Sequence, residues 1–94
     1  MKAITEGETE KYMSQILGWS LTPDSKKISQ EFKFPDFKEA MKFVNKIADI
    51  AEEEGHHPDI HIFYNRVMIE LWTHAVNGLS ENDFIVATKI NAIK

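Results

Sequence analysis

The chain has no cysteine, little basic charge and no long apolar run. Its 94 residues can form neither disulfides nor thiolate metal sites, because there is no cysteine. No window approaches the ~20 consecutive apolar residues that span a bilayer. The first residues show no apolar signal-peptide core. The length and these absences predict one domain, residues 1–94, in a cytoplasmic protein without membrane association.

Basic side chains are outnumbered by acidic ones. The chain has 11 Lys and Arg against 15 Asp and Glu, which gives a net charge of −4. A nucleic-acid-binding surface needs clustered basic side chains on one face. The one dense basic pair, Lys26-Lys27, falls in an expected turn. We therefore expect no nucleic-acid partner.

Helix start and stop signals predict three helices. Thr5 caps the first, over residues 5–16, and Gly18 stops it. Asp36 opens a long helix that ends near Gly55. Ser80, with Asp83 three residues on, opens a third helix that runs to the C-terminus.

Both long helices carry apolar surface beyond a single face. Phe43 and Ile50 widen the apolar stripe of the second helix, and the third is apolar on more than one side. Such residues pack at the core margin or meet a second subunit. We expect a homodimer or homotetramer.

Alternating apolar and polar residues predict four strands. The third and fourth are joined by a tight turn at Asn65-Arg66. The element order, helix-strand-strand-helix-strand-strand-helix, predicts an α+β fold. In this fold three helices pack on one face of a four-stranded antiparallel sheet. The predicted strands are 19–22, 28–34, 59–64 and 67–73.

Three of the four histidines form one constellation. His56 and His57 precede Pro58, and His74 follows seventeen residues after His57. Imidazoles exchange protons near neutral pH. Because Pro58 disfavours helical geometry at His57, the pair lies in an extended loop. Pairing of the last two strands would bring Thr73 and His74 close to His57.

Two carboxylates are within reach of these histidines. Glu52 lies about one helical turn before the pair, and Asp83 opens the following helix. Converging imidazoles and carboxylates indicate proton transfer or a metal site. The spacing between His57 and His61 would suit zinc only on a helix, which Pro58 opposes. Proton transfer without a metal is therefore favoured, and His61 is expected to be an exposed or interface strand residue.

Trp72 lies two residues before His74, on the same face of the predicted strand. It would form an aromatic wall for a ligand or pack at an interface. With Pro58 and Thr73 it is predicted to support the histidines.

One pattern runs through the second half of the chain: Glu52-x-x-x-His56-His57-Pro58, Tyr64-Asn65, His74 and Gly78-Leu79-Ser80-Glu81-x-Asp83. In this pattern the chain resembles the pterin-4a-carbinolamine dehydratase family. Gly18-Trp19, the long central helix and the strand order also match, so the resemblance covers nearly the whole chain.

The resemblance implies a dehydratase that converts 4a-hydroxytetrahydropterin to quinonoid dihydropterin and water. This reaction recycles the pterin used by aromatic amino-acid hydroxylases. It implies dimers or tetramers and no cofactor, since the pterin is the substrate. The implied catalytic residues are His56, His57 and His74, supported by Glu52 and Asp83. We predict proton transfer by His57 and His74, and pterin binding by His56.

Two positions differ from the family pattern. Ile60 stands where many members have an aromatic residue, and Ala75 where many have Glu. Both changes are expected to remove groups around the pterin, and Trp72 would compensate in part. The alternative function is a coactivator-like interaction protein with weak or lost dehydratase activity.

Overall fold

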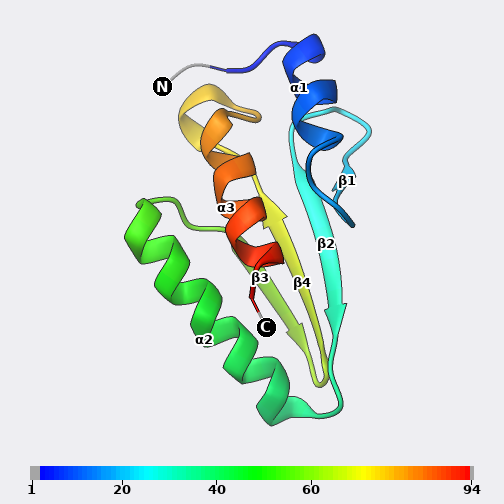
Figure 1. Cartoon of the computed structure of the whole chain (residues 1–94), viewed down its shortest axis with the longest axis vertical. Helices are drawn as coiled ribbons and strands as arrows, with labels where there is room; N and C mark the ends of the chain where they lie inside the picture. The colour runs from blue at the N-terminus through cyan, green and yellow to red at the C-terminus, as the bar shows by residue number, and fades with distance from the viewer. Residues whose placement is uncertain (1–2, 94) are drawn as a thin grey trace.

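The computed structural model describes residues 3–93 and confirms the predicted α+β class and element order (Figure 1). Residues 1–2 and 94 of the predicted domain lie outside the described residues. Strand neighbours follow the order β1-β2-β4-β3 and are all antiparallel. The elements are α1 (Glu6–Met13), β1 (Ser20–Leu21), β2 (Ile28–Lys33), α2 (Phe37–Glu54), β3 (Asp59–Phe63), β4 (Arg66–Leu71), η1 (His74–Val76) and α3 (Glu81–Asn91). Within residues 3–93, no helix is long and apolar enough to cross a membrane.

The predicted helix caps are present in the structure. Thr5 and Glu8 form a reciprocal capping box, with N–H to side-chain oxygen distances of 3.0 and 3.2 Å. Asp36 Oδ1 accepts from the backbone N–H of the first turn of α2, and Gly55 ends that helix in the left-handed conformation. Because these contacts are local, the starts of α1 and α2 can be predicted from the sequence.

The prediction that the first helix extends to residue 16 is wrong. Helix α1 ends at Met13, and the next backbone bonds are shorter-range, from Gln15 N–H to Tyr12 O and from Ile16 N–H to Met13 O. The chain tightens here because Ile16 must enter the core, where it is buried. Gly18 therefore lies in the loop to β1 and does not stop the helix.

The core lies between the sheet and the helices. Val67, Ile69 and Leu71 of β4 are fully buried, as their alternation predicts. Phe43 of α2 is also buried, with its ring 4.6 Å from that of Phe32 and 5.0 Å from that of Phe34. Phe43 thus packs in the core of its own chain. This is the first of the two roles expected for it, the other being contact with a second subunit.

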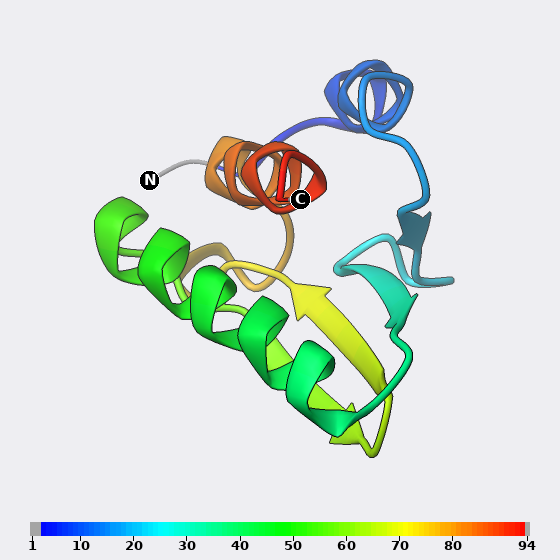
Figure 2. The same cartoon turned by 60° about the horizontal axis from the view of Figure 1, so that its bottom comes forward.

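Helix α3 lies between α1 and α2 (Figure 2). Tyr12 of α1 stacks on Phe84 of α3, with 5.1 Å between ring centroids. On its other sides α3 buries Val86, Ala87 and Ile90. This position accounts for most of the wide apolar surface of α3, while Ile85 stays exposed. The homo-oligomer stays a prediction.

The hairpin between β3 and β4 turns one residue earlier than predicted. Phe63 pairs with Arg66, so the turn is Tyr64-Asn65, and Tyr64 adopts a φ of 50°. The backbone of Asn65 accepts from Phe34 N–H at 2.8 Å, and its side chain donates to Phe34 O at 3.1 Å. These bonds hold Asn65 outside the ladder, which a local pattern does not reveal.

Lys89 links α3 to the end of α2. Its ammonium donates to Glu53 Oε1 at 3.1 Å and also to a carboxylate oxygen of Glu54. The hydrogen bond to Glu54, followed by that to Glu53, raises the pKa of Lys89 above its ordinary value of 10.5. The link fixes the end of α2 directly before the predicted histidine loop.

We expect Gly18→Ala to lower the free energy of unfolding by about 1–2 kcal/mol, because an L-residue resists the φ of 86°. The added Cβ would also meet Gln30 Nε2 at 2.3 Å unless that side chain moved. Gly7→Ala is the matched control. It lies in α1 with nothing within 4 Å of a new Cβ, and should stabilise by up to about 1 kcal/mol. Equal urea midpoints for the two variants would contradict this reading.

We expect Lys89→Met to be less stable than the parent chain at neutral pH. A folded-state pKa that is raised stabilises the fold below the unfolded pKa, and this contribution is lost as the pH rises through the folded pKa. The stability difference should therefore shrink as the pH passes through the raised pKa of Lys89. Urea unfolding across alkaline pH measures it, with Lys42→Met as control, since Lys42 pairs with Glu39 of its own helix and does not link α2 to α3 among residues 3–93. A stability difference that does not change with pH would contradict a stabilising role for the contacts of Lys89 with Glu53 and Glu54.

Candidate functional site

The predicted site residues gather at one end of the sheet. The loop after α2, the start of β3, the chain beyond β4 and the start of α3 meet there (Figure 1). The prediction that the fourth strand runs to Thr73 is wrong. It ends at Leu71, because Thr73 forms a separate bridge with Gly78 and His74 opens the short 3-10 helix η1.

A buried carboxylate connects three of these segments. Asp83 is fully buried, and its Oδ1 lies 2.5 Å from Nε2 of His56. Its Oδ2 accepts from the Thr73 hydroxyl at 2.9 Å and from the Ser80 backbone N–H at 3.0 Å. The Thr73 and Ser80 hydroxyls are 2.7 Å apart. Both carboxylate oxygens are thus satisfied, as a buried polar group requires.

His56 and His57 point to different environments, as expected for neighbours in extended backbone. The His56 side chain is 11% exposed, whereas that of His57 is 62% exposed. Glu52, expected one turn before His56, instead contacts Nε2 of His57. Pro58 continues the extended loop up to the start of β3. One imidazole is therefore fixed inside the fold, and the other faces solvent.

His74 is exposed and lies against Trp72. Their ring centroids are 3.7 Å apart and the rings are tilted by 34°. The indole Nε1–H of Trp72 donates to Asp59 Oδ2 at 3.2 Å, and the Lys27 ammonium lies 4.8 Å from the Trp72 ring centroid. Sequence reasoning missed Asp59 and Lys27. The strand register, once known, identifies both as cross-strand neighbours of the end of β4.

Ile60 lies on the core side of β3. It pairs with Ile69 in the sheet and packs against the hydrophobic core. Because cross-strand partners share a face, Ile60 points to the helix side, away from the face that carries Trp72. Ala75 lies in η1 beside His74 and is exposed.

His61 is an exposed residue of β3, as predicted, with its Nε2 2.9 Å from Glu70 Oε1. Across residues 3–93, no three His, Asp or Glu side chains are grouped as metal ligands would be.

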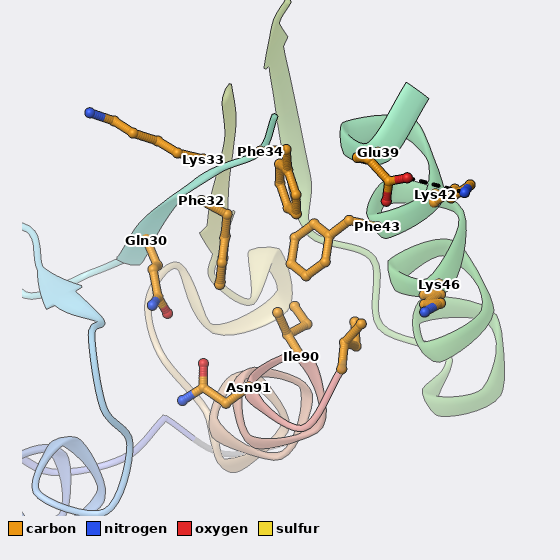
Figure 3. A pocket seen from close by; sticks show the side chains of 11 residues that line it. Gln30, Phe32, Lys33, Phe34, Glu39, Lys42, Phe43, Lys46, Ile90 and Asn91 are labelled. Carbon is orange, nitrogen blue, oxygen red and sulfur yellow. Dashed lines mark hydrogen bonds and ion pairs between the residues drawn. The ribbon is translucent and has the colours of Figure 1, made fainter. Parts of the chain in front are cut away.

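A cavity of about 510 Å³ lies away from the histidines. It opens between β2, the first half of α2 and the end of α3 (Figure 3). Phe32, Phe34, Phe43 and Ile90 form its apolar walls, while Lys33 and Lys42 extend away from it. None of the predicted site residues lines this cavity, so the histidine cluster is a separate feature of the surface.

We expect Thr73→Val to lower the free energy of unfolding by about 1–3 kcal/mol, because Asp83 Oδ2 would lose a buried donor. Thr73→Ser, which keeps the hydroxyl, is the control and should lose less. Urea denaturation of both variants measures the difference. If the two were equally stable, the hydroxyl would contribute nothing through Asp83.

The comparisons with known proteins agree with this architecture. A family model described as pterin 4 alpha carbinolamine dehydratase matches residues 2–93. The chain is 42% identical over 97 residues to "Pterin-4-alpha-carbinolamine dehydratase 2, mitochondrial" of Arabidopsis thaliana. The alignment covers all of this chain but only 52% of that protein, so the chain spans about half the length of the plant relative.

An archaeal relative matches at nearly full length. A "putative pterin-4-alpha-carbinolamine dehydratase" of Sulfolobus acidocaldarius is 44% identical, with 97% of this chain and 98% of that protein covered. A crystal structure from Brucella melitensis, named "transcriptional coactivator/pterin dehydratase", is 37% identical. It superposes with a TM-score of 0.92 over 97% of each chain. The chain therefore belongs to the pterin-4-alpha-carbinolamine dehydratase family, whose enzymes are hydro-lyases.

Proposed function

We propose that this chain dehydrates a 4a-hydroxytetrahydropterin to the quinonoid dihydropterin and water. The observation that carries the proposal is the placement of three imidazoles at one end of the sheet, with two exposed and one buried against Asp83. Family membership supports the substrate class.

The reaction requires only proton transfers from the protein. The 4a-hydroxyl takes a proton, the carbon–oxygen bond breaks, and water leaves. The adjacent nitrogen lone pair stabilises the resulting cation, and loss of the nitrogen proton completes the imine. One group donates a proton and another accepts one, and each such group typically contributes about 10²–10⁴-fold to the rate.

His57 and His74 are suited to these transfers. His57 is mostly exposed, and its contact with Glu52 is also solvent-exposed, so a ligand can reach the imidazole. His74 is exposed in η1. Either imidazole can serve as the acid and the other as the base.

His56 is suited to binding and orienting the pterin. Its Nε2 is held by Asp83, and the Thr73 and Ser80 groups fix that carboxylate in turn. An imidazole held by a carboxylate that is itself fixed keeps one orientation, which favours a fixed contact with the substrate.

The proposal includes no metal and no organic cofactor, since the pterin itself is the substrate. A cytoplasmic location and a homodimer or homotetramer remain predictions.

The alternative, an interaction protein with weak or lost dehydratase activity, was suggested by the wide apolar stripes. The core buries Phe43 and most of the apolar residues of α3, which removes much of the apolar surface on which that alternative rests, although Leu17, Phe63 and Ile85 are exposed.

We expect His57→Ala and His74→Ala each to lower the dehydratase rate by about 10²–10⁴-fold, because each removes a proton-transfer group. The measurement is a stopped-flow assay with chemically generated 4a-hydroxytetrahydropterin, corrected for the buffer-catalysed reaction. His61→Ala is the matched control and should keep the parental rate, since His61 pairs with Glu70 away from the cluster. A parent chain no faster than buffer would reject the enzyme and favour the interaction protein. Full activity in both site variants would reject the residue assignment alone.

A further inference from the structure

Trp72 stands on the face of the sheet that the helices leave uncovered. Val67, Ile69 and Leu71 of β4 point into the core, so the residue after Leu71 points the other way. Continuing the register of β2 and β4 by one pair places Lys27 opposite Trp72, and the ammonium–ring contact bears this out. Continuing the register of β3 and β4 by two pairs, past Pro58 and Leu71, places His57 on the other side of Trp72.

The indole of Trp72 is held in place by two groups besides His74. Its Nε1–H donates to Asp59 Oδ2 at 3.2 Å, and the Lys27 ammonium is 4.8 Å from the ring centroid. A hydrogen bond fixes the rotation of the ring, and a cation over the ring adds attraction. The indole is thus a fixed surface next to the proposed proton-transfer residues.

His74 differs from the other two histidines in how it is held. His56 and His57 each contact a carboxylate, Asp83 and Glu52 respectively. Within residues 3–93, the imidazole of His74 makes no hydrogen bond to another side chain, and its recorded ring contact is with Trp72. Both ring nitrogens are therefore available to a ligand, and stacking is what orients the ring.

We infer that Trp72 is a positioning residue: it orients the His74 imidazole for proton transfer and is itself held by Asp59 and Lys27. This inference rests on the proposed function. It replaces the expectation of an aromatic wall for the pterin. With 3.7 Å between the ring centroids, His74 covers part of the indole that a pterin would otherwise stack on.

The first test separates positioning from substrate binding. Trp72→Leu should lower kcat by about 10- to 100-fold, since a misplaced catalytic group loses rate, while KM changes little. Trp72→Phe keeps an aromatic ring beside His74 and should restore most of kcat. Asp59→Ala removes the hydrogen bond to the indole but keeps the indole itself. It should lower kcat by a smaller factor than Trp72→Leu does.

Phe63→Leu is the matched control for losing an aromatic ring. Phe63 lies on the same face at the far end of β3, and the Arg66 guanidinium carbon lies 5.2 Å from its ring centroid. Its removal should leave both kcat and KM unchanged. A rise in KM at constant kcat in Trp72→Leu would identify a pterin wall and overturn the inference, as would unchanged kcat and KM.

A second readout does not depend on turnover. In the 94-residue chain, the Trp72 ring current should shift the NMR signals of the His74 ring protons, and Trp72→Leu should remove this shift while the His61 signals stay in place. If the parent chain lacked dehydratase activity, the proposed function would fail while the stacking could still be seen. If the parent were active but His74 signals were identical in Trp72→Leu, the positioning role alone would fail.

Discussion

The arrangement of the site depends on the buried carboxylate of Asp83. Its two oxygens join the loop after α2, the chain beyond β4 and the first turn of α3, through His56, Thr73 and Ser80. A buried carboxylate is costly unless it is fully hydrogen-bonded. Here the donors, together with the positive end of α3, meet that requirement. The same carboxylate that caps a helix therefore also orients an imidazole.

The three histidines have three different environments, which suits a reaction that needs unlike groups. His56 is buried against Asp83, His57 is exposed beside Glu52, and His74 is exposed and stacked on Trp72. Different surroundings let identical side chains take different roles. A binding role for the buried imidazole and proton transfer by the exposed pair follow from this difference in our proposal.

Helix α3 serves both the fold and the site. Its buried residues pack between the sheet, α1 and α2, while its first turn supplies Asp83. Lys89, two turns further along, holds the end of α2 through Glu53 and Glu54. The histidine loop therefore starts from a helix end that is fixed by the same helix that holds His56. Stability and site geometry are coupled, because one element contributes to both.

The sequence by itself determined the element order, the helix starts, the core face of β4 and the proximity of Asp83 to the loop that carries His56. These features depend on local caps, on strand alternation and on a short hairpin. Only the tertiary structure decided where elements end and which partners meet. Helix α1 stops early because Ile16 enters the core, and β4 stops because Thr73 bonds to Gly78 and Asp83. Likewise, the stacking of His74 on Trp72, with Asp59 and Lys27 around the indole, depends on β2, β3 and β4 being neighbours at one end of the sheet. Periodicity tells which face a residue occupies, but the point where a chain leaves a sheet is set by hydrogen bonds to residues distant in sequence.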